Sequence, residues 1–350
     1  MQSVDYYLSK AIERGASDVH LVSSDAPTIR IYGQLERIDK EDGLLDNKEL
    51  MAEVYKMLTK EQIEKFEEDW ELDYAYELKE ARFRINLHYQ SGQIGLAARL
   101  IPTVIPTPEE INLEPTLYEL THLQQGFILV TGPTGCGKST TLASMINIIN
   151  QERRCHIITL EDPIEFIYPT LQSVVEQREI GRDTKSFHAG LKRVLRQDPN
   201  VILVGEMRDP ETMAAALTAA ETGHLVFSTL HTNSAAETME RIIDSFDTFR
   251  QKQILVQLAA SLRAVVTQQL VPTIDGKVTV VREIMINTPA IANLIRHNKI
   301  AQIPSVIQTG KIDGMVTTNA ALKNLYNRGI ISEETYRNRM VSSDKVGTFF

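Results

Sequence analysis

The fold is decided by one stretch of sequence, Gly132-Pro133-Thr134-Gly135-Cys136-Gly137-Lys138-Ser139-Thr140. The apolar run Phe127–Val130 precedes it and predicts a buried strand, and Thr141–Ile146 is typical of the start of a helix. A strand, a glycine-rich turn ending in Lys-Ser-Thr and a helix together form the P-loop pattern. Backbone N–H groups in such a turn, with the positive end of the helix dipole, bind phosphate groups. The sequence therefore predicts a nucleoside triphosphate site at residues 132–140.

Three side chains of this stretch have separate predicted roles. Lys138 is expected to reach the β- and γ-phosphates of the nucleotide, and the Ser139 hydroxyl is expected to ligate Mg²⁺. Cys136 occupies a position where a small side chain is tolerated, and we interpret it as a spacer.

Length and composition restrict the class of protein. The 350 residues predict about two domains. The net charge of −9 argues against binding of nucleic acid along a basic surface. The two cysteines, Cys136 and Cys155, do not form a C-x-x-C pair, which excludes a zinc site built on cysteine clusters.

No stretch of the sequence predicts insertion into a membrane. The first residues lack the basic region and apolar stretch of a signal peptide. The best candidate for a transmembrane helix, residues 254–271, is interrupted by Gln257, Arg263, Gln268 and Gln269. We expect a cytoplasmic protein that meets the membrane only through partners.

Sequence patterns divide the chain into four segments. Residues 1–100 mix short strand and helix patterns and predict an α+β domain. Residues 101–115 contain four prolines, which stiffen the backbone, and predict a connector. Residues 116–288 alternate apolar runs with helical patterns and predict a mainly parallel α/β sheet. Residues 289–350 are rich in helical patterns.

Individual elements follow from the same patterns. In the first segment, helical regions are predicted at Tyr6–Arg14 and Lys48–Phe66. Its predicted strands are Val19–Val22, Thr28–Tyr32, Asp73–Tyr76, Arg82–Asn86 and Ile94–Arg99. The predicted core strands of the third segment are Phe127–Val130, His156–Leu160, Val201–Val204 and Leu225–Leu230.

Acidic residues follow two of the predicted core strands. Glu161, Asp162 and Glu165 come after the second core strand, and Glu206 comes after the third, separated from it by Gly205. Ligand sites in open α/β sheets lie at the carboxyl ends of the strands. We expect Glu206 to hold Mg²⁺ through water, where many P-loop enzymes have an aspartate one position away.

Two histidines flank the fourth core strand, His224 before it and His231 after it. A straight strand would separate them by roughly 23 Å, so they cannot share one metal ion. His231 lies at the carboxyl end and is expected to sense the γ-phosphate. His224 is interpreted as a structural histidine with hydrogen-bonded partners.

Five blocks of the sequence form a recognisable set, Arg14–Leu21, Gly132–Thr140 (Walker A), Leu160–Phe166 (Asp box), Gly205–Asp209 (Walker B) and Ala219–Thr232 (His box). Together, these motifs resemble those of the secretion ATPase superfamily, and in particular those of the type IV pilus retraction ATPases. The resemblance covers nearly the whole chain, and the Asp box, the atypical Walker B and the His box, in this order, are highly specific.

The resemblance implies an N-terminal PAS-like domain, a RecA-like ATPase domain and a helical C-terminal region. It also implies a homo-hexameric ring that hydrolyses ATP with Mg²⁺ and drives pilus retraction through a platform protein of the inner membrane. In this family pattern, Glu165 is the general base that activates water and Glu206 supports the magnesium ion.

The resemblance further implies arginines supplied by a neighbouring subunit, and Arg82, Arg84 and Arg99 match them. From the residues alone, Arg82 and Arg84 fit two interpretations equally well. They fit a role at the γ-phosphate, where a guanidinium stabilises charge at a subunit seam. They also fit the solvated face of a strand, because they alternate with Phe83 and Ile85.

One departure concerns a helix that retraction ATPases of this kind carry with the sequence Ala-Ile-Arg-Asn-Leu-Ile-Arg. Residues 290–296 match it except that Ala292 replaces the first arginine. An accessory retraction motor is therefore an alternative to the main one. A pilus-extension or type II secretion ATPase is another, but its tetracysteine module needs more than two cysteines. The acidic charge balance argues against a nucleic-acid translocase.

Overall fold

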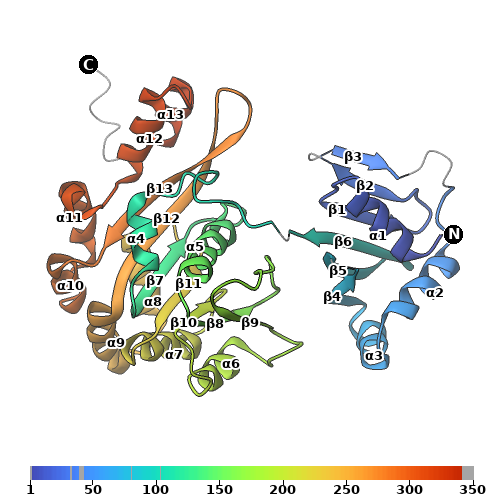
Figure 1. Ribbon diagram of the computed structural model, residues 1–350, viewed down its shortest axis with the longest axis horizontal. Helices are drawn as coiled ribbons and strands as arrows, with labels where there is room; N and C mark the ends of the chain where they lie inside the picture. The colour runs from blue at the N-terminus through green and yellow to red at the C-terminus, as the bar shows by residue number, and fades with distance from the viewer. Residues whose placement is uncertain (1, 32–33, 39–42, 80, 103, 341–350) are drawn as a thin grey trace. The chain divides into compact units, whose positions relative to one another are not determined.

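The computed structural model describes residues 2–31, 34–38, 43–79, 81–102 and 104–340. The chain divides into two compact units. The first consists of Met1–Val104 with Glu165–Ile167, and the second of Ile105–Ile164 with Tyr168–Phe350. Figure 1 shows the helices and strands of each unit.

The first unit is built on a six-stranded antiparallel sheet in the order β3-β2-β1-β6-β5-β4. Along β5, Phe83 and Ile85 are fully buried in the core, whereas Arg82 and Arg84 alternate with them on the other face. The strands are β1 (Asp18–Val22), β2 (Thr28–Ile31), β3 (Gln34–Arg37), β4 (Glu71–Leu78), β5 (Ala81–Gln90) and β6 (Gln93–Ile101). The helices are α1 (Val4–Glu13), α2 (Asn47–Met57) and α3 (Lys60–Asp69).

The helical region predicted at Lys48–Phe66 is two helices in the structure. Leu58 follows α2 in an extended conformation, and α3 starts with a capping box in which Thr59 and Gln62 bond to each other's backbone N–H groups. Such a box satisfies the N–H groups of a new helix start. The other predicted elements of this unit are present with shifted ends, although Tyr32 lies outside the described residues. Strand β3 had no predicted counterpart.

The second unit is built on a seven-stranded sheet in the order β13-β12-β7-β11-β10-β8-β9. All neighbours pair in parallel except β13, which is antiparallel to β12. The strands are β7 (Gly126–Thr131), β8 (His156–Glu161), β9 (Val174–Glu179), β10 (Val201–Val204), β11 (Leu225–Leu230), β12 (Leu262–Pro272) and β13 (Val278–Ile286). The helices are α4 (Pro115–Thr121), α5 (Lys138–Glu152), α6 (Phe187–Val194), α7 (Pro210–Glu221), α8 (Ala235–Asp244), α9 (Thr248–Ser261), α10 (Pro289–Arg296), α11 (Ile303–Thr309), α12 (Thr318–Asn327) and α13 (Glu333–Arg339), with short 3₁₀ turns η1 (Ile300–Gln302) and η2 (Lys311–Asp313).

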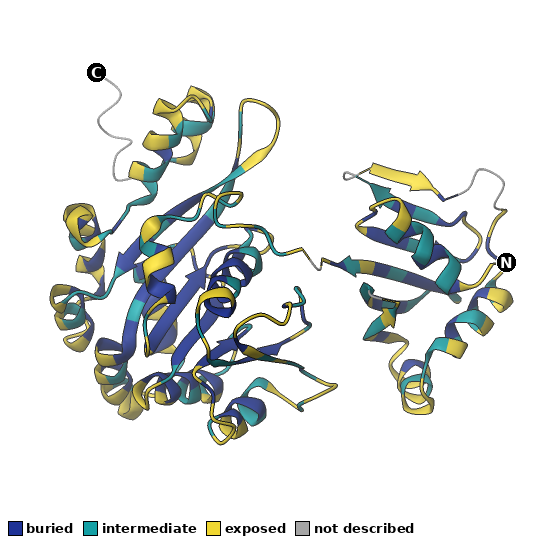
Figure 2. Ribbon diagram, viewed as in Figure 1, coloured by how far each residue is buried: buried dark blue, intermediate teal, exposed yellow. Residues whose placement is uncertain are grey.

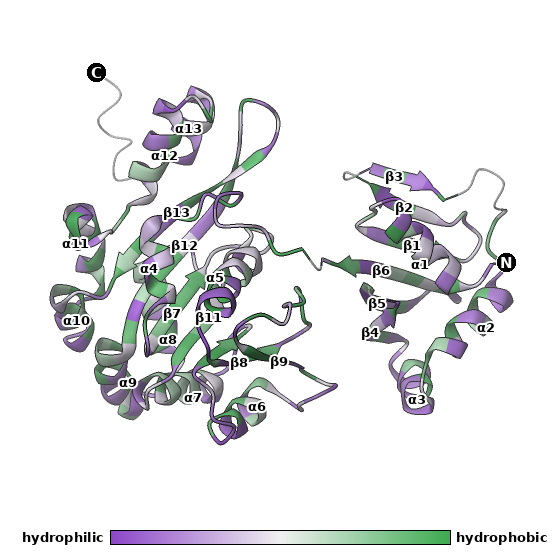
Figure 3. Cartoon of the chain, in the orientation of Figure 1, coloured by the Kyte–Doolittle hydropathy of each residue, from purple (hydrophilic) through white to green (hydrophobic). Residues whose placement is uncertain are grey.

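The central strands β7, β10 and β11 are buried along their whole length, as Figure 2 shows. Figure 3 shows that hydrophobic residues are concentrated in the strands of this sheet. Strands covered on both faces are continuous apolar runs in the sequence. This is why the sequence predicts the four core strands within one residue of their observed ends.

Strands β9, β12 and β13 have no predicted counterpart. The window 254–271 contains the end of α9 and most of β12, where Thr267 and Gln268 are buried polar residues and Arg263 and Gln269 are partly buried ones. These polar positions hide the strand pattern. No helix among the described residues is long and apolar enough to cross a membrane. Helices α10 to α13 follow β13, and residues 341–350 lie outside the described part of the chain.

Candidate functional site

Residues 132–137 form a loop between the end of β7 and the start of α5. Three glycines of this loop, Gly132, Gly135 and Gly137, have φ values of 138°, 75° and 87°. A Cβ on Gly132 would also lie 2.2 Å from the carbonyl oxygen of Gln268. The backbone path therefore requires glycine at this position for conformation and for close approach. Since α5 begins directly after the loop, its first N–H groups are available to an anion, as in a phosphate-binding loop.

Lys138 is buried at the start of α5, with its ammonium group turned back to the loop. Its Nζ donates to the carbonyl oxygens of Gly132 at 2.8 Å and of Pro133 at 3.1 Å. Cys136 is 3% exposed, and burial raises the pKa of its thiol. Its Sγ lies 2.8 Å from where a Cβ of Gly132 would be. This close approach of Cys136 is a further reason why position 132 requires glycine.

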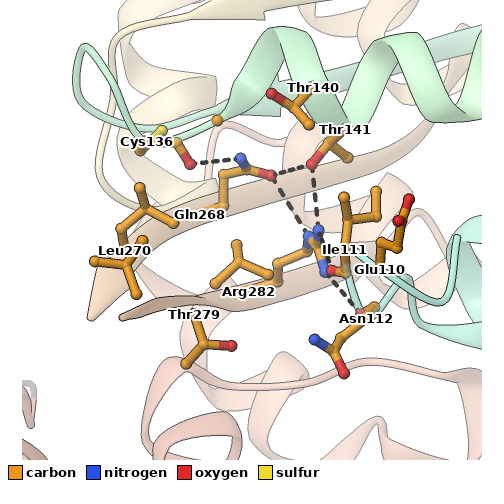
Figure 4. Close-up of a pocket in the computed structure, with 13 residues that line it drawn as sticks. Glu110, Ile111, Asn112, Cys136, Thr140, Thr141, Gln268, Leu270, Thr279 and Arg282 are labelled. Atoms are coloured by element: carbon orange, nitrogen blue, oxygen red, sulfur yellow. Dashed lines mark hydrogen bonds between the residues drawn. The ribbon is translucent and has the colours of Figure 1, made fainter. Parts of the chain in front are cut away.

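Two polar residues without a predicted role at the site, Gln268 and Arg282, lie beside the loop (Figure 4). Nε2 of Gln268 donates to the carbonyl oxygen of Cys136 at 2.8 Å, and its Oε1 accepts from Oγ1 of Thr141 at 3.0 Å. Arg282 also donates to Oγ1 of Thr141, at 3.2 Å. Both residues belong to strands without a predicted counterpart. The sequence could have pointed to Gln268, because it is a polar residue inside the largely apolar window 254–271.

Glu206 follows β10 and connects two charged neighbours. Its side chain is 15% exposed, and Oε1 pairs with the guanidinium of Arg208 at 2.7 Å. Its Oε2 lies 3.8 Å from Nε2 of His231, which follows β11. Burial lowers the pKa of His231, the charge of Lys138 adds to this effect, and Glu206 opposes it. Glu206, His231 and Lys138 therefore interact electrostatically where β10, β11 and the loop after β7 end.

His224 lies at the opposite end of β11 from His231. Its Nδ1 is 2.9 Å from the carbonyl oxygen of Ala219 and 3.3 Å from Oγ1 of Thr222. These contacts hold the turn between α7 and β11, which agrees with the interpretation of His224 as a structural residue.

The acidic residues that follow β8 have different environments. Glu161 is 8% exposed, and its Oε1 accepts hydrogen bonds from Oγ1 of Thr159 at 2.6 Å and from Nε2 of Gln177 at 3.3 Å. Asp162 and Glu165 are exposed. A buried carboxylate with a hydrogen-bonded oxygen is suited to support the local structure, whereas an exposed one is accessible to water and nucleotide.

The segment that carries Glu165 is held on both sides by β9. The backbone N–H of Ile164 donates to Oε2 of Glu179 at 3.3 Å, and the N–H of Tyr168 donates to Oε1 of Gln177 at 3.0 Å. Neither β9 side chain was predicted to matter. The strand alternates polar and apolar residues only weakly, so the sequence offered no clear signal for them.

The three predicted arginines lie on the face of the first sheet opposite its core. Arg84 and Arg99 are direct neighbours across β5 and β6. Each arginine has an acidic partner within the unit, Arg82 with Glu77 at 3.8 Å, Arg84 with Asp73 at 3.7 Å and Arg99 with Asp18 at 2.8 Å. The second unit by itself therefore brings together the loop, Glu206 and His231, while the arginines and Glu165 belong to the first.

Comparisons with known proteins give the family. The family model described as type II/IV secretion system protein matches residues 105–339. The type IV pilus retraction ATPase PilT of Pseudomonas aeruginosa is 44% identical over 333 residues, 95% of this chain and 96% of that protein. The type IV pilus ATPase PilU of the same organism is 38% identical over 335 residues, 95% of this chain and 86% of that protein. A crystal structure of the pilus retraction motor PilT with bound ADP matches with a TM-score of 0.91 and 41% identity, covering 99% of both chains.

The likeness extends over both units and confirms the prediction of an α/β fold. It also agrees with the motifs from which the sequence resemblance was drawn. The chain therefore belongs to the type II/IV secretion system protein family and, within it, to the type IV pilus retraction ATPases.

Proposed function

We propose that this protein is a motor that hydrolyses ATP to retract type IV pili. The observation that carries the proposal is its 44% identity with a pilus retraction ATPase over 95% of the chain. The geometry of the P-loop supports it, because the loop has the glycine conformations and the buried lysine that phosphate binding requires. ATP is the nucleotide that residues 132–140 would bind.

The donor atoms near the loop fit a magnesium ion held together with the nucleotide. The hydroxyl of Ser139 in the first turn of α5 and the carboxylate of Glu206 after β10 are hard oxygen ligands. Bound magnesium would neutralise charge on the β- and γ-phosphates. Lys138 would exchange its carbonyl partners for phosphate oxygens, and Arg208 would hold the Glu206 carboxylate in orientation.

Hydrolysis also needs groups that position water and respond to the γ-phosphate. We assign Glu165 as the general base, since it is exposed on a segment that β9 holds in place. We assign His231 as the group that senses the γ-phosphate. Its lowered pKa keeps the imidazole neutral at pH 7, so it has one donor and one acceptor nitrogen.

A homo-hexameric ring accounts for the arginines of the first unit. In this arrangement Arg82, Arg84 and Arg99 of one subunit would reach the nucleotide of its neighbour. Each arginine forms an ion pair with an acidic residue of its own chain. To contact a phosphate, its guanidinium must either break this ion pair or bind both groups at once. A γ-phosphate carries more charge than one carboxylate and would compete well for the guanidinium.

The segments of the chain would take different parts in this motor. We assign residues 1–100 to a PAS-like domain, 101–115 to a linker, 116–288 to a RecA-like ATPase core and 289–350 to a helical C-terminal region. The antiparallel first sheet and the order β12-β7-β11-β10-β8 of the second support these assignments. We place the motor in the cytoplasm, at the inner membrane, where a pilus platform protein would be its partner.

Complementation of a strain that lacks its retraction ATPase tests the proposal. The wild-type protein should restore twitching motility and reduce the number of surface pili, and Lys138→Ala should do neither, because it removes the phosphate-binding ammonium group. Purified wild-type protein should release phosphate from ATP. Deletion of this protein from its own cells gives a second result. If the deleted cells have no surface pili, the protein is an extension motor instead.

A second candidate, an accessory retraction motor, is favoured by one position. Ala292 replaces an arginine in helix α10 and is partly buried against the core, with Ile291 and Ile295 fully buried beside it. Ala292→Arg should increase retraction in the complemented strain if the missing guanidinium limits it. Equal retraction by both forms would show that Ala292 does not separate a main motor from an accessory one.

A further inference from the structure

Arg282 on β13 joins three parts of the second unit through one side chain. It is 1% exposed, and its guanidinium has five N–H donors. Nε faces Oε1 of Gln268 at 3.5 Å, and one amino group donates to Oγ1 of Thr141 at 3.2 Å. The remaining bonds go to the chain before α4, to the carbonyl oxygens of Ile111 at 3.3 Å and Asn112 at 3.0 Å and to Oε2 of Glu114 at 2.9 Å.

The other end of this network reaches the phosphate-binding loop. Gln268 donates to the carbonyl oxygen of Cys136, and Thr141 on α5 donates to Gln268. The side chain of Gln268 also lies 3.4 Å from where a Cβ of Gly137 would be. Figure 4 shows this chain of hydrogen bonds from Cys136 through Gln268 to Arg282 and Asn112. The loop and the segment Ile111–Glu114 are thus separated by only two side chains.

Segment Ile111–Glu114 is loosely packed apart from these bonds. A cavity of about 240 Å³ lies between Ile111, the loop and β12–β13, and a second of about 560 Å³ lies between the segment, β13 and helices α11 and α12. The backbone N–H groups of Ile111, Asn112 and Leu113 bond to carbonyl oxygens of residues 107–109. Because the packing leaves room on both sides, the hydrogen bonds to Arg282 set where the segment lies.

We propose that Arg282 is a positioning residue that transmits phosphate occupancy of the loop to segment Ile111–Glu114. The segment continues the chain that leads out of the first unit, which ends at Val104. A phosphate that draws Lys138 away from the carbonyl oxygens of Gly132 and Pro133 changes the loop that Gln268 contacts. Gln268 and Arg282 pass this change to the segment. The inference rests on the proposed function, because it requires phosphate binding at the loop.

Hydrogen exchange at the backbone amides of Thr107 and residues 109–114, with and without Mg²⁺-tripolyphosphate, tests the proposal. Tripolyphosphate fills the phosphate site but has no nucleoside, so no base or ribose can enter the adjoining cavity that Ile111 lines and act on the segment directly. In the wild-type protein, tripolyphosphate should slow exchange in the segment by about fivefold or more, the lower range of coupling between sites. Binding is measured separately by calorimetry.

Thr141→Val is the decisive variant, because it keeps the shape of the side chain and removes the hydroxyl that joins α5 to Gln268 and Arg282. It should bind tripolyphosphate and lose most of the change in exchange at the segment. Arg282→Lys, which keeps the charge but not the planar set of donors, should behave in the same way. Thr279→Val is the matched control, since Thr279 lines both cavities outside this network, and it should respond like the wild type.

Two results would overturn the proposal. One is an unchanged segment in wild-type protein that binds tripolyphosphate, and the other is a full response in Thr141→Val. Failure of the wild-type protein to bind tripolyphosphate or ATP would overturn the proposed function as well, and calorimetry identifies that case by itself. Circular dichroism and thermal melting of each variant show whether it is folded.

Discussion

At the scale of single residues, ATP hydrolysis should depend most strongly on Glu165, the proposed general base. Glu165→Gln keeps the size of the side chain and removes its ability to accept a proton. We expect phosphate release to fall by about 10²- to 10⁴-fold, the usual contribution of general base catalysis. Binding of a fluorescent ATP analogue should remain close to that of the wild type.

Asp162→Asn is the matched control, because Asp162 is an exposed carboxylate on the same loop. It should retain substantially more activity than Glu165→Gln. Normal turnover in Glu165→Gln would show that another group activates the water.

His231 predicts how activity depends on pH. Its pKa is lowered from the ordinary value of 6.5, chiefly by burial and then by the charge of Lys138. Protonation would pair the imidazolium with Glu206 and draw that carboxylate from the magnesium ion. Activity should therefore decline at some pH below 6.5, and the remaining activity of His231→Asn should lack this decline. A wild-type profile that declines already above pH 6.5 would contradict the lowered pKa.

The same shift affects stability. Because the folded pKa lies below the unfolded value, the unfolded chain binds the proton more readily, and the fold loses stability as pH falls below 6.5. The thermal midpoint of His231→Asn should depend less on pH in this range than that of the wild type.

At the scale of elements, the P-loop shows how much a motif reveals before the fold is known. The glycine spacing predicted the turn, and the structure adds a reason for Gly132 that the motif does not contain, the 2.2 Å approach to the carbonyl oxygen of Gln268. The core strands were predictable because each is a short, mainly apolar run with no Lys, Arg, Asp or Glu inside the predicted bounds. Strands β12 and β13 were not, because buried polar residues such as Gln268 and Arg282 interrupt their patterns.

The loop geometry predicts different effects of alanine at two glycines. Gly132→Ala should abolish binding of the ATP analogue, because the new Cβ would meet backbone atoms that cannot move easily. Gly135→Ala also imposes backbone strain, at a φ of 75°, but has open space for its Cβ, so binding should weaken less. Equal loss of binding in both variants would show that backbone strain alone decides the effect.

At the scale of the whole molecule, the proposed ring makes each active site depend on two subunits. Arg84→Ala/Arg99→Ala protein and Glu165→Gln protein should each have little activity. In a mixture of equal amounts, half of the subunits have intact arginines and the other half have an intact Glu165. About a quarter of the subunit interfaces in a head-to-tail ring would therefore combine both. Phosphate release should rise above that of either protein alone.

Mass photometry of the mixture checks that rings form and exchange subunits. A mixture that exchanges subunits without gaining activity would indicate that the arginines act within their own chain, where Asp73 and Asp18 already pair with them.

The amino-acid sequence by itself determined the phosphate-binding loop, the acidic residues after the core strands and the family resemblance, because each is a contiguous motif whose chemistry is local. Only the tertiary structure decided which distant polar groups meet. Arg282 contacts Thr141 and Ile111 across 141 and 171 positions of the chain. Such contacts depend on strand order and register, which local patterns do not encode. Burial then makes them specific, because a guanidinium removed from water must find a partner for each donor.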